Sequence, residues 1–347
     1  RVRKAKQVLN KTDVAVLVVD ARDKTLGGAD GELLALFREK GVPCVVARNK
    51  SDLLEGPVVT EPVIGGGSLP PAPAPQSSAV PSFAEMYVSA KTGSGVNELK
   101  ECIASLAKTE EPKLRIVADL VRPGDFVVLV TPIDSAAPKG RLILPQQQTI
   151  RDVLEADAAA IVVKEFELKE TLERLGVKPA LVITDSQAFA KVSADTPPDI
   201  PLTSFSILFA RFKGFLLPAV RGVKSLDSAG DGDRILVCEG CTHHRQCDDI
   251  GTVKLPRWIK QYTGKNPEFV FSSGGGFPGD LSSYKLVVHC GACMLNEREM
   301  RYRQKCAEDQ DVPFTNYGIA IAFMQGILKR SLRVFPRMLA ELEGPES

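Results

Sequence analysis

Short apolar runs alternate with amphipathic stretches along the first third of the chain. Residues 14–19 form an unbroken apolar run, which predicts a strand buried on both faces of a parallel sheet. Residues 31–41 place leucines and a phenylalanine on one helical side and end on a glycine, so they predict a helix. Further buried strands are predicted at 43–49 and 85–89, and a helix at 95–108. This order predicts a doubly wound α/β domain.

Residues 56–82 interrupt this pattern between the second and third predicted strands. Seven prolines lie between Pro57 and Pro81, together with three consecutive glycines. Such a composition opposes compact structure, so we expect a surface insertion. The remaining sheet would have three strands, and its first strand would risk an exposed edge.

The middle of the chain predicts a second α/β unit. Its expected strands lie near 126–132, 160–164 and 180–184, and its expected helices near 148–157, 166–175 and 185–192. No His or Cys occurs from 103 to 237, which favours a mechanical role over catalysis. A sheet this small can be completed by a second copy, so we expect a homodimer.

Two polar motifs follow successive predicted strands of the first domain. In doubly wound sheets, ligands bind outside the carboxyl ends of the strands. The Asn-Lys-x-Asp and Ser-Ala-Lys motifs resemble the guanine-recognition motifs of translation-factor-type GTPases. The residues concerned are Asn49, Lys50, Asp52, Ser89, Ala90 and Lys91. The resemblance implies that Asp52 accepts hydrogen bonds from guanine, Asn49 ties the loops, Lys50 covers the base and the Ala90 amide marks the carbonyl.

The phosphate-binding parts of a GTPase are missing from this sequence. No G-x-x-x-x-G-K-[ST] motif occurs, and no D-x-x-G precedes the first strand. We therefore expect a truncated Ras-like G domain without a Mg²⁺ site, which does not hydrolyse GTP. The first residue, an arginine, supports the same expectation of truncation.

Soft ligands gather late in the chain. All three histidines and five of the eight cysteines lie between residues 238 and 293. Cys241 and His243 follow one predicted strand, and Cys290 and Cys293 follow another, just before a helix beginning near Asn296. Three thiolates with nearby imidazoles suit Zn²⁺ or an iron-sulfur cluster. The lack of two tight ligand pairs favours iron-sulfur, with zinc left as the alternative.

These motifs and their order resemble the HydF family, the [FeFe]-hydrogenase maturation GTPases. The pattern C-x-H…H-C-x-x-C is similar to that family's signature, and stretches at 140–152, 202–214 and 248–256 are similar too. The resemblance implies a [4Fe-4S] cluster on Cys241, Cys290 and Cys293. It also implies that His243 lies near the cluster and that Asp248 is a further candidate for a weak fourth ligand.

The resemblance also implies an architecture and a role. Residues 1–110 would be the C-terminal part of a GTPase domain, 111–205 a small α/β dimerisation domain and 206–347 an α/β cluster-binding domain. The protein would be a GTP-responsive scaffold that delivers a diiron precursor to apo-hydrogenase and works with radical-SAM maturases. Two other readings are a regulatory or ribosome-associated GTPase with structural zinc, and an iron-sulfur redox enzyme.

Composition narrows the partners and the compartment. The formal net charge is +1, so no basic surplus indicates nucleic acid. No apolar run reaches the length needed to span a bilayer. We therefore expect no nucleic-acid or membrane partner, and a cytoplasmic location. The Pro- and Ala-rich insertion would also fit an algal chloroplast stroma.

Overall fold

The computed structural model describes most of the chain and divides it into two units. The described residues are 12–23, 25–26, 28–39, 41–56, 58–64, 83–107, 115–132, 142–240, 249–274, 276–295 and 297–344. The first unit spans Arg1–Lys113 and the second Leu114–Ser347. Each unit is α/β, as the sequence predicts.

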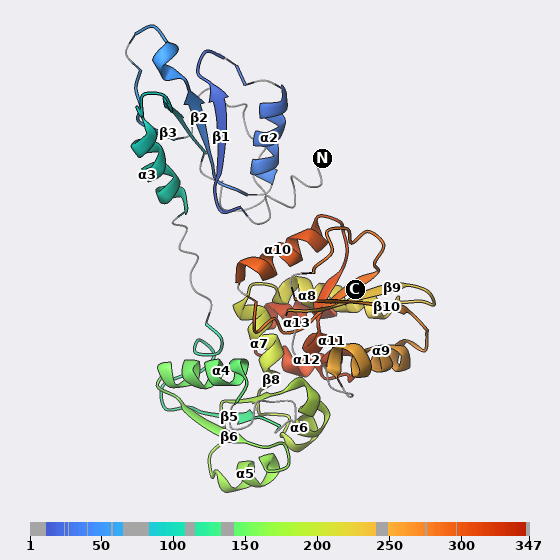
Figure 1. Ribbon diagram of the computed structural model, residues 1–347. Coiled ribbons are helices and arrows are strands. Elements are labelled where there is room, and N and C mark those ends of the chain that lie inside the picture. The colour runs from blue at the N-terminus through green and yellow to red at the C-terminus, as the bar shows by residue number, and fades with distance from the viewer. Residues whose placement is uncertain are drawn as a thin grey trace. The chain divides into compact units, whose positions relative to one another are not determined.

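The first unit is a four-stranded sheet in the order β1-β2-β4-β3, with α2 and α3 on opposite faces (Figure 1). Its elements are β1 (Ala15–Asp20), α2 (Gly28–Glu39), β2 (Cys44–Asn49), the 3-10 turn η1 (Ser51–Leu53), β3 (Val63–Ile64), β4 (Phe83–Tyr87) and α3 (Val96–Ala107). The strands β1, β2 and β4 are parallel and β3 is antiparallel.

Two expectations for this unit are wrong. The strand β1 is not buried on both faces: Val16 and Val18 are 38% and 61% exposed, because β1 is an edge strand and α2 covers only the face of Ala15, Leu17 and Val19. The insertion is also not wholly without structure. Val63 and Ile64 pair with Glu85 and Ala84 of β4 as a fourth strand. A strand this short can form at the edge of a sheet because it needs only the backbone groups of one neighbouring strand.

The second unit contains two parallel four-stranded sheets of the same topology. Their strand orders are β6-β5-β7-β8 and β10-β9-β11-β12. We call residues 126–223 the first repeat and residues 234–331 the second repeat. Both repeats contribute to one large hydrophobic core.

The first repeat matches most of the predicted elements. It comprises β5 (Phe126–Val130), α4 (Leu144–Glu155), β6 (Ala159–Val163), α5 (Leu168–Arg174), β7 (Leu181–Thr184), η2 (Ser186–Ala188), α6 (Phe189–Asp195), β8 (Leu202–Ser204), α7 (Phe205–Phe212) and α8 (Leu216–Val223). The three-residue strand β8 was not predicted, because a run this short before a hydrophobic helix carries no period of its own.

The second repeat carries the cysteine motif. It comprises β9 (Arg234–Glu239), the π-helix η4 (Ile250–Lys254), α9 (Leu255–Thr263), β10 (Glu268–Ser273), β11 (Leu286–His289), α10 (Glu297–Glu308), β12 (Phe314–Asn316), α11 (Tyr317–Met324) and α12 (Leu328–Ser331). The 3-10 turn η3 (Lys224–Leu226) precedes it, and α13 (Pro336–Glu343) follows it.

The two repeats agree in detail where β8 meets α7 and where β12 meets α11. Ser204 caps α7 by accepting from the Ile207 amide at 3.2 Å, and Asn316 caps α11 by accepting from the Ile319 amide at 2.8 Å. Each helix then ends before a glycine in the left-handed region, Gly214 in one case and Gly326 in the other.

The last helix of each repeat packs against the last strand of the other repeat. The helix α8 packs against β12 so closely that a Cβ on Gly222 would lie 2.2 Å from the Phe314 carbonyl oxygen. In return α12 packs against β8, where Arg330 donates to the carbonyl oxygens of Ser193 and Thr196 at 2.7 Å. These two reciprocal helix–strand contacts therefore hold the second unit together.

No helix among the described residues is long and apolar enough to cross a membrane.

Candidate functional site

The cysteine motif lies at the carboxyl ends of the two central strands of the second repeat. The strands β9 and β11 are parallel, and their last pair is Cys238 with His289. One step further, the Cys290 amide donates to the Cys238 carbonyl oxygen at 2.8 Å. This is the edge of a doubly wound sheet at which ligands bind.

Residues 290–295, which we call the cysteine reversal, carry two thiols and end in a turn in which the Leu295 amide donates to the Ala292 carbonyl oxygen at 3.1 Å. Ala292 has a φ of +54°, which is rare for a residue with a Cβ, and its side chain is buried. The Cys290 sulfur accepts from the amides of Gly240 at 3.1 Å and Ala292 at 3.4 Å. Cys293 is partly exposed. Two amide donors aimed at one sulfur favour its thiolate, which is the form that binds metals.

Lys213 holds this reversal from the first repeat. The lysine follows α7 and is 8% exposed, so its charge is largely removed from water. Its ammonium donates to the carbonyl oxygens of Ala292 and, at 3.0 Å, of Leu295. A buried cation next to two cysteines offsets the negative charge that thiolates bring. Sequence reasoning missed this residue; its only signal was a place in a stretch that resembles the HydF family.

The His289 side chain is buried behind the site and contacts the site through the backbone of Cys290. It is fully buried, with Nε2 3.0 Å from an Arg303 nitrogen and Nδ1 2.9 Å from the Cys290 carbonyl oxygen. Because Arg303 can only donate, Nε2 accepts and Nδ1 donates. Burial lowers the pKa of His289 to about 3, and the Arg303 and Lys213 charges act in the same direction. The ring is therefore neutral.

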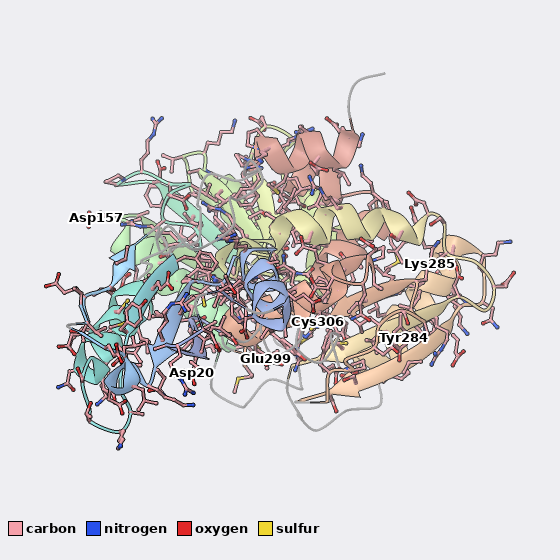
Figure 2. All side chains as sticks on the ribbon, turned by 90° about the horizontal axis from the view of Figure 1, so that it is seen from above. Asp20, Asp157, Tyr284, Lys285, Glu299 and Cys306 are labelled. Carbon is pink, nitrogen blue, oxygen red and sulfur yellow. The ribbon has the colours of Figure 1, made fainter. Side chains whose placement is uncertain are left out.

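Arg303 is the most deeply buried charged side chain at this site, and each of its three guanidinium nitrogens makes a hydrogen bond. Besides His289, it donates to the Glu299 carboxylate at 3.0 Å and to the Gly274 carbonyl oxygen at 2.6 Å. Its guanidinium lies 5.2 Å from the Phe277 ring centroid. Figure 2 labels Glu299, which α10 carries. Arg303 thus ties α10 to the end of β11.

Cys238 differs from the two thiols of the reversal. It is fully buried, and burial raises its pKa to about 12. A thiol that resists ionisation is a poor metal ligand. Neighbouring Glu239 is also buried, at 4% exposure.

The other predicted ligands, Cys241, His243 and Asp248, lie outside the described residues. Within the described part of the chain, no group of three His, Cys, Asp or Glu side chains is placed to hold a metal. Cys290 and Cys293 are thiol donors of the kind that binds iron-sulfur clusters, and the amide of Gly240, the residue before Cys241, donates to the Cys290 sulfur. The donor set therefore fits a cluster if residues 241–248 supply the third thiolate.

The first unit brings the guanine-motif residues together. The Asn49 side-chain oxygen accepts from the Ala90 amide at 3.0 Å, which ties the loops after β2 and β4. The buried Ser89 hydroxyl donates to the Asp52 carboxylate at 2.6 Å and so orients it. Lys91 is exposed.

Lys50 has an additional partner that the motif alone did not indicate. Its φ is +66°, and its ammonium donates to the Asp20 carboxylate at 2.8 Å, at the end of β1. Arg22 also binds Asp20, and the two cations hold the pKa of this carboxyl well below its usual range. Asp20 therefore holds the Lys50 side chain of the Asn-Lys-x-Asp loop at the end of β1.

The fold and the thiol-bearing strand ends define a multidomain α/β protein with a sulfur-rich candidate site. Two family descriptions match the second unit. The hydrogen maturase F dimerization domain matches residues 116–214, and the hydrogen maturase F tetramerization domain matches residues 217–334. The chain belongs to the [FeFe]-hydrogenase maturase family HydF. It therefore carries this family's oligomerisation domains and has a general role in hydrogenase maturation.

Proposed function

We propose that this chain is the cluster scaffold of hydrogenase maturation, which binds a [4Fe-4S] cluster and delivers the diiron precursor to apo-hydrogenase. Cys241, Cys290 and Cys293 are the proposed ligands. One observation carries this proposal: the Cys290 sulfur receives two backbone amides at the junction of β9 and β11. Hydrogen bonds of this kind tune sulfur ligands of iron-sulfur clusters.

Three cysteines leave one iron of a four-iron cluster without a thiolate, which supplies an exchangeable position when the cluster is bound. The residues of this chain shape that position. Lys213 holds the reversal that carries the two thiols, and neutral His289 holds the Cys290 carbonyl group. Asp248 is the proposed weak ligand, with His243 near it.

Partner chemistry follows from the same role. A scaffold must receive its cargo and release it, so apo-hydrogenase and radical-SAM maturases are the proposed partners. The homodimer is the proposed assembly of the domain at 116–214.

The first unit is the proposed guanine-nucleotide sensor. Asp52, whose carboxylate accepts from the Ser89 hydroxyl, is the proposed acceptor for the paired donors on the guanine edge. Adenine lacks those donors, so the buried mismatch would cost binding free energy. Nucleotide binding would then switch the scaffold between loading and delivery.

Anaerobic reconstitution of variants tests the ligand set. We expect Cys293→Ser and Cys241→Ser to lose the bound iron that wild type retains after desalting. Cys238→Ala and Cys102→Ala should retain it, because both thiols are buried and Cys102 lies in the first unit. Full iron in the first two variants would contradict the ligand assignment.

Saturation-transfer NMR with nucleosides tests the guanine site independently of phosphate contacts. Guanosine should bind and adenosine should not. Ser89→Ala should weaken guanosine binding about fivefold, since one hydrogen bond contributes roughly 1 kcal/mol. Ser105→Ala is the matched control, because the Ser105 hydroxyl donates to the Cys102 carbonyl oxygen within α3. Equal binding of both nucleosides would reject the site.

A further inference from the structure

Tyr317 begins α11 directly beside the cysteine reversal. The last pair of β11 and β12 is His289 with Asn316. The residues that follow these two strands are Cys290 and Tyr317. Asn316 caps the helix through the Ile319 amide, which fixes the direction in which α11 starts. Tyr317 therefore stands at the same sheet edge as the proposed cluster ligand.

The Tyr317 hydroxyl is buried and has no hydrogen-bond partner among the described residues. A buried donor without a partner is costly, and native structures rarely keep one without a reason. The space around it is shaped by a glycine. A Cβ on Gly251 would lie 2.4 Å from the hydroxyl oxygen and 2.7 Å from a Glu239 carboxylate oxygen. The absence of that Cβ leaves room for the hydroxyl.

The surroundings of this hydroxyl are electron-rich. Burial raises the pKa of Tyr317 well above its usual range, and the negative groups around it, Cys290 first and then Glu239, raise it further. A tyrosine hydroxyl carries its proton near neutral pH, so this hydroxyl can donate to an acceptor. Thiolates and sulfides are such acceptors, and they are the atoms that a bound cluster places beside Cys290.

The first repeat offers an internal comparison. Its equivalent of Cys290 is Asp185, whose amide donates to the Val130 carbonyl oxygen as that of Cys290 does to Cys238. Its equivalent of Tyr317 is Phe205, which follows the capping Ser204 and is 4% exposed. The repeat without cysteines at its strand ends thus has the same aromatic ring without the hydroxyl.

We propose that Tyr317 is a positioning residue of the cluster site, whose hydroxyl donates a hydrogen bond to a sulfur atom of the cluster or of its Cys290 ligand. This inference rests on the proposed cluster binding at Cys290 and Cys293. The hydroxyl has no partner among the described residues, and it acquires its acceptor when the cluster binds. Its role is to stabilise the negative charge on sulfur and so to retain the cluster.

The test compares Tyr317→Phe with wild type in two states. Without iron, the variant should unfold at the same temperature as wild type or higher, because Phe removes an unpaired buried hydroxyl and Phe205 shows that the ring position accepts it. With the cluster reconstituted, the reduction midpoint should move to a more negative potential. Loss of iron to a chelator should become roughly tenfold faster, the lower end of the effect of outer contacts on metal affinity.

Tyr284→Phe is the matched control. Tyr284 lies before the amino end of β11, opposite to the site, with its ring 5.0 Å from Arg234; Figure 2 labels it. This control should leave both the potential and the chelation rate unchanged. A Tyr317→Phe protein with wild-type potential and chelation rate would overturn the inference. If wild type itself takes up no cluster, the proposed function fails first, which is a separate result.

Discussion

The two repeats of the second unit share one topology and differ at their strand ends. In the first repeat, Asp185 and Phe205 follow β7 and β8; in the second, Cys290 and Tyr317 follow β11 and β12. The backbone bonds are the same, as the Asp185 and Cys290 amides show. The sheet therefore decides where a site can lie, and the side chains at its edge decide its chemistry. The largest expected effects accordingly come from those side chains.

The sharpest way to break the comparison is to remove the equivalent residue from each repeat. Cys290→Ser should abolish cluster retention, because serine is a poor ligand for iron in place of the thiolate. Asp185→Ser should leave it unchanged, although Asp185 caps η2 through the Gln187 amide. Bound iron per chain after reconstitution and desalting measures both. Equal loss in both variants would show that general instability, not ligation, is responsible.

No arginine or lysine among the described residues of the first repeat is as deeply buried as Arg303. Arg303→Met removes the hydrogen bonds that Arg303 donates to buried His289 Nε2, to the Gly274 carbonyl oxygen and to the partly exposed Glu299 carboxylate. We expect the free energy of unfolding of the iron-free protein to fall by about 3 kcal/mol. Chemical denaturation monitored by circular dichroism measures it.

Lys191→Met in α6, the helix equivalent to α10, is the control. Its pair with Asp195 is partly exposed, so a change below about 0.5 kcal/mol is expected. An Arg303 variant as stable as this control would reject the supporting role of the buried arginine.

Lys213 sharpens the comparison because it joins the two repeats. Lys213→Met removes the donor to the Ala292 and Leu295 carbonyl groups. The expected cost is about 2 kcal/mol of unfolding free energy, together with faster cluster loss to a chelator. Gln325→Met, at the equivalent position after α11, serves as control. Unchanged cluster retention in Lys213→Met would show that the reversal does not depend on this lysine.

The smallest expected effect concerns the ion pair between Arg211, on α7 of the first repeat, and Asp119, which precedes that repeat. Burial raises the pKa of Asp119, but its hydrogen bond and charge interaction with Arg211 on α7 lower it to a greater extent, so the net pKa lies below the usual value. The equivalent residue on α11 is Phe323. Below a pH of about 4 the unfolded chain binds more protons than the folded one, so the contribution of the pair is present in full above that pH and is lost as pH falls.

Unfolding of Asp119→Asn between pH 7 and pH 3 checks this sign. The variant should be less stable than wild type by no more than about 1 kcal/mol at pH 7, and the difference should shrink on acidification. A difference that grows on acidification would contradict the lowered pKa.

The sequence predicts the longer elements and the position of the motifs. Runs such as β2 and β7 are apolar enough to indicate buried strands, and the Cys-x-x-Cys motif follows β11 as expected. The ties between Asn49 and Ala90 also follow from the rule that ligand loops leave the carboxyl ends of parallel strands.

The rest depends on tertiary contacts that no local pattern encodes. The strands β8 and β12 are three residues long, so their period is invisible. Lys213 acts on a loop about 80 residues away. The exposed face of β1 has the same composition as a buried one, because an edge strand differs from a central strand only in what lies beside it.

Metal analysis of the wild-type chain after anaerobic reconstitution with iron and sulfide tests the central claim most directly. The account predicts about four irons and four sulfides per chain, a broad visible band near roughly 400 nm and an S = 1/2 EPR signal after reduction. One tightly bound zinc ion in a colourless protein that takes up no iron would contradict the assignment of a [4Fe-4S] cluster.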